Sequence, residues 1–395
     1  MSSPLVSICI PTYNRPNLLQ RAVCSCLAQT YPNFEIVVTD NSTDFASREV
    51  LAKLSDPRIR YYSNSGNIGA TASVNRGLSL ATGKYISTLM DDDLLKPQCL
   101  ELMVEAFENH PTVGVVMAPM HLIGADDERI FPKFYIFRTM RYRYRYQVGD
   151  GFVDRRRVLK DFLTRDYPCC VPSGIMYRAE GLRRIGPADP SADFAGDLDF
   201  AMRLAVYYDF YYIDQVLTSW RYVPSSHTAT LHQNGLNIGA FYYVTRKCLA
   251  QDETKKLFAD EWETLVRDSI FFCSCRALLN GLAGLRAKSP RLILKTIKTI
   301  LKEDPASEVT QVRHENRSFD DVRKIKALVL QDQLDVLKRA LGLRTNVADN
   351  KHPSLRHDWY LTGTEKESAQ ANCLAVRADR DSGARGVNHS FAFSH

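Results

Sequence analysis

The sequence has no long hydrophobic run. A bilayer-spanning helix needs roughly 18 or more consecutive apolar residues, and the best run here, around Val113–Met120, reaches only about eight. Residues 1–6 also lack the basic segment and the cleavage site of a signal peptide. We therefore expect a cytoplasmic protein, whose contact with a membrane, where there is any, is peripheral.

Cysteine is present, but not at the spacing of a metal site. Most of the ten cysteines lie in apolar, periodic segments, where a thiol packs as a small hydrophobe. The pairs Cys24-x-Cys26 and Cys273-x-Cys275 have one intervening residue, whereas zinc knuckles have two to four. This spacing argues against structural zinc and favours reduced thiols.

Two common phosphate-binding motifs are missing as well. Gly83-Lys84 resembles the end of a P-loop, but Gly77 lies one position too far before it. Tyr85 also replaces the required Ser or Thr. No Gly-x-Gly-x-x-Gly follows the first expected strand. The sequence thus disfavours a Walker-type ATPase and a nicotinamide enzyme, and its net charge of +6 permits an anionic partner without requiring one.

What the sequence does contain is an alternation of short β-branched runs with longer amphipathic ones. This pattern predicts an α/β fold with a mainly parallel sheet flanked by helices. The expected strands are Leu5–Ile10, Phe34–Asp40, Ile59–Tyr62, Tyr85–Met90 and Val113–Met117. The expected helices lie near Leu18–Gln29, Phe45–Leu54, Ala70–Ala81 and Pro97–Asn109. In such sheets ligands bind outside the carboxyl ends of the strands.

Three consecutive carboxylates, Asp91, Asp92 and Asp93, follow the fourth expected strand. Adjacent carboxylates repel one another, and a hard divalent cation such as Mg²⁺ or Mn²⁺ removes that cost by binding their oxygens. Such a cation would also neutralise the charge on a departing diphosphate. The alternative is a solvated acidic turn that caps the next helix.

Polar residues also follow the second and third expected strands. A carboxylate at Asp40 suits the N–H of a base or the hydroxyls of a ribose, while Ser42 or Asp44 suits a helix cap. Asn67 and Gly69 lie where a small residue lets the backbone approach a ligand. With the acidic cluster, these residues predict a nucleotide crevice at one edge of the sheet.

Asp197 and Asp199 open a further expected helix. Asp197 is a candidate general base that takes a proton from an acceptor hydroxyl. Arg203 follows on a nearby turn, and we expect it to keep the Asp197 carboxylate ionised. The alternative is that both aspartates only stabilise the N-terminus of the helix.

Together these residues resemble glycosyltransferase family 2, a group of inverting enzymes with the GT-A fold. The resemblance runs from about Pro4 to His227. It is most specific at Val6–Pro16, which reads VSICIPTYNRP, and at Leu27–Glu35, which reads LAQTYPNFE. The order and spacing of the motifs carry the resemblance.

The resemblance and the sequence pattern together predict the domain organisation. Residues 1–232 would form the GT-A domain, with a nucleotide-binding half at 1–120 and an acceptor-side half at 121–232. Residues 233–344 show apolar residues at helical spacing and would form an α-helical subdomain. Residues 345–395 are polar and aperiodic, which is typical of a disordered tail.

The roles expected of individual residues follow. We expect donor contacts from Pro11, Tyr13, Asp40, Asn67 and Asp91. We expect metal ligation from Asp92, Asp93 and His227. By the resemblance Asp197 would be the base and His227 would lie near the diphosphate or metal, although an ordinary loop histidine fits His227 equally well.

The segment Arg141–Tyr146 alternates arginine with tyrosine. In the enzyme, Tyr142 and Tyr144 would line the acceptor side together with Arg203, because aromatic faces stack on sugar rings. The same alternation suits a non-catalytic protein that binds a polyanion or a nucleic acid, and it also describes an edge strand. We favour the enzyme, and with it no nucleic-acid partner.

The segment Leu285–Lys302 places basic residues among aliphatic ones. It could rest on the inner face of the cytoplasmic membrane, where a lipid-carried acceptor is found, or pack its apolar face on the protein.

The sequence therefore predicts an inverting glycosyltransferase that uses Mn²⁺ or Mg²⁺. The donor would be a UDP-, GDP- or dTDP-linked sugar, and the acceptor a saccharide or a lipid-linked saccharide. The setting would be bacterial-type synthesis of a surface polysaccharide or glycoconjugate. In a single displacement, Asp197 would deprotonate the acceptor hydroxyl as the nucleoside diphosphate departs from the opposite face.

Overall fold

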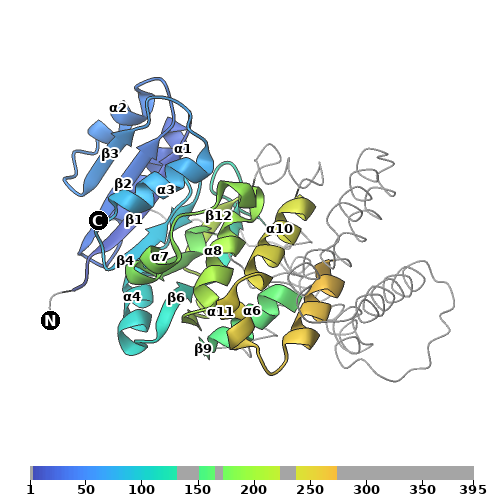
Figure 1. Cartoon of the computed structure of the whole chain (residues 1–395). Helices are drawn as coiled ribbons and strands as arrows, with labels where there is room; N and C mark the ends of the chain where they lie inside the picture. The colour runs from blue at the N-terminus through green and yellow to red at the C-terminus, as the bar shows by residue number, and fades with distance from the viewer. Residues whose placement is uncertain (1–2, 131–150, 165–171, 223–236, 274–395) are drawn as a thin grey trace, which may run out of the picture. The chain divides into compact units, whose positions relative to one another are not determined.

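The computed structural model describes residues 3–130, 151–164, 172–222 and 237–273 (Figure 1). Its centre is an eight-stranded sheet in the order β3-β2-β1-β4-β10-β6-β11-β9. These strands are β1 (Val6–Thr12), β2 (Phe34–Asp40), β3 (Ile59–Ser63), β4 (Tyr85–Thr88), β6 (Val113–Met117), β9 (Gly151–Val153), β10 (Ile175–Arg178) and β11 (Asp209–Tyr212).

The first four strands along the chain are parallel neighbours. The register aligns Thr12 with Asp40 and Asp40 with Ser63, so the carboxyl ends of β1, β2 and β3 are level. Strand β10 lies antiparallel between β4 and β6, and the edge strand β9 is antiparallel to β11. The predicted mainly parallel sheet is therefore confirmed, with an antiparallel insertion that the sequence pattern did not predict.

A second, four-stranded sheet has the order β5-β12-β7-β8. Its strands are β5 (Leu94–Leu95), β12 (Thr218–Arg221), β7 (Met120–Ile123) and β8 (Arg129–Ile130). Strand β5 directly follows the three aspartates, and it pairs with the later strand β12. This pairing brings residues near 220 to the acidic turn.

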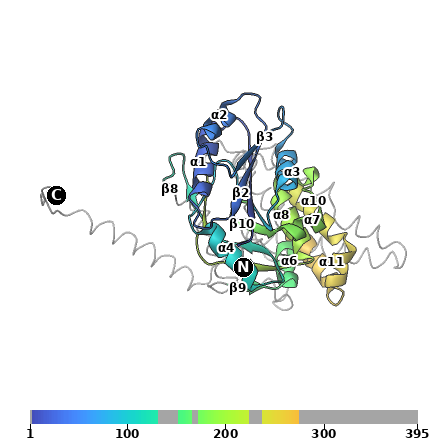
Figure 2. The same ribbon diagram turned by 90° about the vertical axis from the view of Figure 1, so that its left-hand side faces the viewer.

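Helices cover both faces of the large sheet (Figure 2). They are α1 (Pro16–Leu27), α2 (Ala46–Ala52), α3 (Ala70–Leu80), α4 (Cys99–Asn109), α6 (Arg155–Thr164), α7 (Ala179–Ile185), α8 (Gly196–Ala205), α10 (Asn237–Leu249) and α11 (Asp252–Leu257). Two 3-10 turns, η1 (Pro172–Gly174) and η2 (Pro190–Ala195), precede β10 and α8. Figure 2 shows α1 on one side of the sheet and α3 and α8 on the other.

The alternation of side chains along the strands builds two hydrophobic layers. Ile8 and Ile10 belong to the cluster that contains α1 and α4. Cys9, between them, belongs to the other cluster, which contains α6, α8 and α10. Successive strand residues point to opposite faces, so a continuous apolar strand suits a sheet covered on both sides.

The four helices expected before residue 110 are confirmed, with ends that differ by at most two residues. In α1, Pro16 occupies the first turn, where its missing N–H costs nothing, and Leu19, Ala22, Val23 and Cys26 form the buried face. In the described part of the chain, no helix is long and apolar enough to cross a membrane. Residues 262–273 are helical, and the helices expected beyond residue 273 lie outside the described residues.

Candidate active site

Asp91 faces the end of strand β1. The Thr12 hydroxyl donates to its Oδ2 at 2.8 Å, and Nη1 of Arg15 donates to its Oδ1 at 3.2 Å. Asp91 is 6% exposed. Burial, and then the neighbouring Asp92 carboxylate, raise the pKa of Asp91 from its ordinary value to about 6, although Arg15 and Thr12 oppose the change.

Asp92 is the most exposed of the three aspartates. Its Oδ2 accepts from Nη1 of Arg15 at 3.1 Å, so one guanidinium nitrogen bridges Asp91 and Asp92. Burial raises the pKa of Asp92 despite the nearby arginines. The side chain of Arg15 is 43% exposed. Two crowded carboxylates that share one exposed arginine have the electrostatics of a cation site.

Asp93 points into the protein instead. It is fully buried, accepts a hydrogen bond from the Ser173 hydroxyl, and accepts another from the backbone N–H of Arg221 at 2.9 Å. Burial holds its pKa well above the ordinary value. Both carboxyl oxygens therefore have protein partners. This geometry indicates that Asp93 stabilises the conformation of the acidic turn.

Arg221, at the end of β12, ties that turn to the second sheet. Its Nε donates to the backbone oxygen of Asp92 at 2.9 Å, and its Nη1 donates to the backbone oxygens of Gly124 and Ala125. Its Nη2 binds Asp127. Arg221 is 3% exposed. The sequence alone does not point to Arg221, Ser173 or Thr12, because only the pairing of distant strands brings them to this turn.

Asp40, at the end of β2, is fully buried. Its Oδ1 accepts from the backbone N–H of Ser42 at 2.8 Å, and its Oδ2 accepts from the Tyr61 hydroxyl at 2.9 Å. The Ser42 hydroxyl in turn accepts from the N–H of Asn14 at 2.8 Å. Asp40 thus links the loops after β1 and β2, and Tyr13 in the first loop is 46% exposed. Pro11, near the end of β1, is half-buried.

Asn67 shapes the loop before α3. Its Oδ1 accepts from the N–H of Gly69 at 2.9 Å and from Nδ2 of Asn41 at 3.3 Å. Gly69 has φ = 90°, a left-handed conformation that glycine adopts without strain. The loop is therefore held against the end of β2, on the same edge of the sheet as Asp40 and Asp91.

Asp197 lies in the first turn of α8 and is half-buried. Its Oδ1 accepts from the N–H of Leu198 at 2.8 Å. The expected pairing of Arg203 with Asp197 is wrong, because Nε of Arg203 binds Oδ2 of Asp199 at 2.8 Å. Residues four apart lie one turn apart on the same helix face, whereas residues six apart do not.

The guanidinium of Arg203 binds groups inside the protein. It also donates to the backbone oxygens of Ile185 and Pro187, and Arg203 is 8% exposed. Three other expected site residues, His227, Tyr142 and Tyr144, lie outside the described residues. Among residues 3–130, 151–164, 172–222 and 237–273, no three His, Cys, Asp or Glu side chains gather as a complete metal site.

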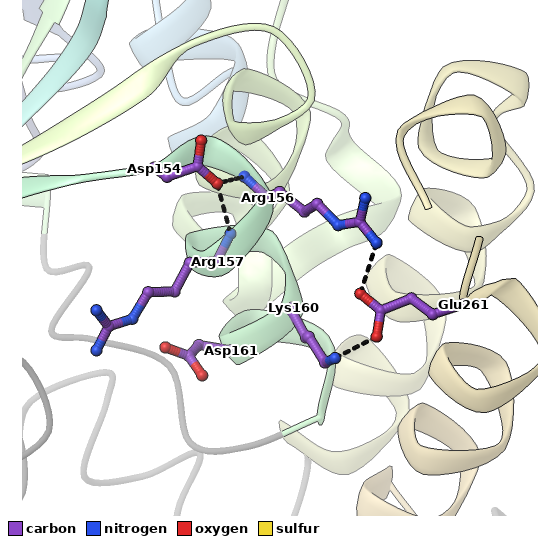
Figure 3. A pocket seen from close by; sticks show the side chains of 6 residues that line it. All are labelled: Asp154, Arg156, Arg157, Lys160, Asp161 and Glu261. Carbon is purple, nitrogen blue, oxygen red and sulfur yellow. Dashed lines mark hydrogen bonds and ion pairs between the residues drawn. The ribbon is translucent and has the colours of Figure 1, made fainter. Parts of the chain in front are cut away.

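A separate pocket lies beside α6 (Figure 3). Figure 3 shows Arg156 and Lys160 both pointing toward Glu261, which binds Arg156 at 2.9 Å and also binds Lys160. Asp154 accepts from the N–H groups of Arg156 and Arg157 at the start of the helix. These contacts hold α6 to the segment around residue 261, and the pocket is distinct from the strand-end site.

Comparison with known proteins gives an independent result. The family model described as Glycosyl transferase family 2 matches residues 7–186. WcaA of Escherichia coli (strain K12), which its name assigns to colanic acid biosynthesis, is 40% identical over 105 residues, or 26% of this chain and 38% of that protein. An uncharacterized glycosyltransferase of Nostoc sp. (strain PCC 7120 / SAG 25.82 / UTEX 2576), alr2836, is 30% identical over 196 residues, or 47% of this chain and 54% of that protein. The chain thus spans about half or less of the length of these two relatives.

A solved structure supports the architecture. S. aureus TarS 1-349 in complex with UDP-GlcNAc has a TM-score of 0.50 and 16% identity, covering 78% of this chain and 92% of that chain. At this identity the likeness shows the fold alone, and it confirms the GT-A-like arrangement expected from the sequence.

Proposed function

Because residues 7–186 of this chain match the family model described as Glycosyl transferase family 2, we propose that the protein is an inverting nucleotide-sugar glycosyltransferase. One observation carries the proposal. Thr12, Arg15, Asp91 and Asp92 meet at the carboxyl ends of neighbouring parallel strands. Ligands bind at this edge in open α/β sheets, and the crowded carboxylates there favour a cationic partner.

The nucleoside of the donor would bind over the loops after β1, β2 and β3. Tyr13 offers an exposed ring for stacking on a base, and Pro11 lies beside it in the chain. Asp40 and Asn67 hold these loops through the hydrogen bonds described above, and Asp91 would face the ribose. This assignment is supported by the level ends of the three strands.

A divalent cation, Mn²⁺ or Mg²⁺, fits the same edge. The donor set is the one such cations prefer, and the Arg15 guanidinium already stands between the two carboxylates that would receive the positive charge. Asp92, the most exposed of the three aspartates, would be the principal ligand. When bound, the cation would stabilise negative charge on the departing diphosphate. Asp93, whose oxygens are already bonded, would hold the turn in place.

Asp197 would act as the general base. The N–H of Leu198 orients the Asp197 carboxylate, which would accept the proton of the acceptor hydroxyl. The acceptor oxygen would then form its bond to the anomeric carbon as the bond to the diphosphate oxygen breaks. The electron pair of that bond leaves with the nucleoside diphosphate, and attack from the opposite face inverts the anomeric carbon.

For the acceptor we propose a saccharide or a lipid-linked saccharide of a bacterial surface polysaccharide. The name of the similar WcaA protein, which places it in colanic acid biosynthesis, supports this class. We also propose that the reaction takes place in the cytoplasm. The described cysteines are free thiols, and free thiols suit a reducing compartment.

Thermal unfolding in the presence of nucleotides tests the proposal. We would screen UDP, GDP and dTDP and their sugar conjugates, each with and without Mn²⁺, because a ligand that binds only the folded state raises its stability. We expect one nucleotide series to stabilise the protein, and more strongly with Mn²⁺. No stabilisation by any nucleotide would refute the assignment.

Two variants separate the metal from the nucleotide. Asp92→Asn should abolish the additional stabilisation by Mn²⁺ while keeping part of the stabilisation by nucleotide alone. Asp126→Asn removes an exposed carboxylate from the turn between β7 and β8, and it should behave as the wild type. Equal Mn²⁺ effects in the wild type and Asp92→Asn would reject Asp92 as a ligand.

A further inference from the structure

Lys247 of α10 bridges two aspartates that flank Asp197 in the sequence. Its Nζ lies 2.7 Å from Oδ2 of Asp189 and 2.9 Å from Oδ1 of Asp199. Asp189 immediately precedes η2, and Asp199 lies in the first turn of α8. One ammonium group therefore joins the segment before the candidate base to the helix that carries it.

The charge distribution makes this link strong. Lys247 and Tyr243 lower the pKa of Asp189 from its ordinary value. Burial favours the neutral form of Lys247, but its hydrogen bonds to the two carboxylates outweigh that effect and raise its pKa. Asp199 is 2% exposed, so its contact with the ammonium is screened little by water. Asp189 and Lys247 are therefore both charged at neutral pH, and their ion pair persists through the neutral range.

Apolar packing reinforces the same link. Phe241, Val244 and Cys248 of α10 belong to the buried cluster that also contains Leu198 and Ala201 of α8. Helix α10 also contacts η2 directly. The backbone on both sides of Asp197 is thus held by α10, a helix that lies beyond the part of the chain matched by the family model.

We propose that Lys247 is a positioning residue for the base Asp197, so that α10 is part of the catalytic apparatus. The proposal rests on the proposed function, since it assigns a role to a group that acts through Asp197. Lys247 would act on Asp197 indirectly, by fixing the η2–α8 segment that carries it. Positioning matters because a displacement of about 1 Å at a reacting group lowers the rate by up to about 10²-fold.

Replacement of Lys247 should leave the protein folded, because both of its carboxylate partners have other partners. Without Lys247, Asp189 still accepts from the Tyr243 hydroxyl at 2.7 Å, and Asp199 still pairs with Arg203. Neither carboxylate loses its last partner. Replacement of the lysine should therefore loosen the segment without unfolding the protein.

The first experiment compares Lys247→Met with Lys247→Arg, which keeps the positive charge and several donors. Lys256→Met, on the exposed surface of α11, is the matched control. We expect Lys247→Met to lower kcat by about 10- to 100-fold, while the Kd for the nucleoside diphosphate changes by less than about twofold. Lys247→Arg should recover most of the turnover, and Lys256→Met should match the wild type.

A kcat for Lys247→Met within about twofold of the wild type would overturn the proposal, as would equal loss of turnover and nucleotide affinity. The second measurement needs no substrate. Amide hydrogen exchange across residues 189–199 should be faster in Lys247→Met than in the wild type and in Lys256→Met, and unchanged exchange would overturn the positioning role. A wild type without transferase activity would instead refute the proposed function, so the two failures are distinct.

Discussion

Asn75 and Ala188 exchange two hydrogen bonds. Nδ2 of Asn75 donates to the backbone oxygen of Ala188 at 2.9 Å, and the N–H of Ala188 donates to Oδ1 of Asn75 at 2.7 Å. Asn75 lies on α3, which packs against β1 and β2, and Ala188 precedes η2. The pair joins the strands of the donor side to the segment that leads to Asp197.

Asn75→Ala should destabilise the protein by about 1–3 kcal/mol, because both backbone groups of the buried Ala188 lose their partners. Urea unfolding measures the change. Asn33→Ala is the control, since Asn33 is exposed and its amide donates only to the backbone of Ser3. A similar change in the free energy of unfolding of both variants would show that the hydrogen bonds of Asn75 stabilise the protein no more than that of Asn33.

Asp197→Asn should lower kcat by about 10²–10⁴-fold, since a positioned general base contributes that much and an amide cannot take the proton. The affinity for the nucleoside diphosphate should persist, as measured by calorimetric titration. Asp252→Asn, an exposed carboxylate at the start of α11, serves as the control. Comparable turnover of Asp197→Asn and the wild type would exclude Asp197 as the base.

Asp91 should make the stability of the metal-free protein depend on pH. Its pKa in the folded protein is about 6, above the ordinary value of 3.8, so the folded state keeps the proton to higher pH than the unfolded state does. The stabilising contribution of the neutral carboxyl is complete below about pH 4 and is lost as the pH rises through about 6.

Asp91→Asn removes this dependence. In the presence of a chelator, the variant should be more stable than the wild type at about pH 7.5, by up to about 3 kcal/mol, and nearly equal to it at about pH 4. Denaturant unfolding at the two pH values measures both differences. The same stability difference at both values would show that Asp91 is not the cause.

Arg203→Met should destabilise the protein by about 3 kcal/mol, because it breaks a buried ion pair and leaves the backbone oxygens of Ile185 and Pro187 without their donor. Arg267→Met, which breaks the exposed pair with Asp268, should cost about 0–1 kcal/mol. Thermal unfolding of both variants measures the contrast. If Arg203→Met proved as mild as Arg267→Met, the buried pair would not stabilise α8.

Strands β1 to β4 and β6 and helices α1 to α4 could be predicted because their local sequence pattern matches their environment, whereas the two-residue strand β5 was not predicted. Strand β6 was expected at Val113–Met117 and is found there, since an apolar run bounded by polar residues suits a strand covered on both faces. The insertion of β10 between β4 and β6 could not be predicted in this way. Its four residues pair with strands far away in the sequence, and periodicity carries no information on such pairing.

The acidic cluster could be located from the sequence, but the separate environments of its members could not. Asp91 turns to β1, Asp92 to the more exposed side and Asp93 to the interior. The partners that decide this, Thr12 and Arg221 among them, come from strands before and after the turn. Likewise, the expected partner of Arg203 was wrong. Asp197 and Asp199 both lie in the first turn of α8, but only Asp199, four residues before Arg203, lies on the same helix face.

The Arg15 guanidinium gives the acidic pair a built-in counter-ion. On the proposed function, a divalent ion that binds Asp91 and Asp92 would take the place of a charge already present, so its binding would be an exchange. The net free energy of that exchange would be the difference between the free energies of the two sets of ion pairs. It would be smaller in magnitude than the free energy of either set alone. Additional anionic oxygens, such as those of a diphosphate, would shift the balance toward the divalent ion. They would also give the released arginine a new partner, which would couple the binding of the ion to the binding of the nucleotide.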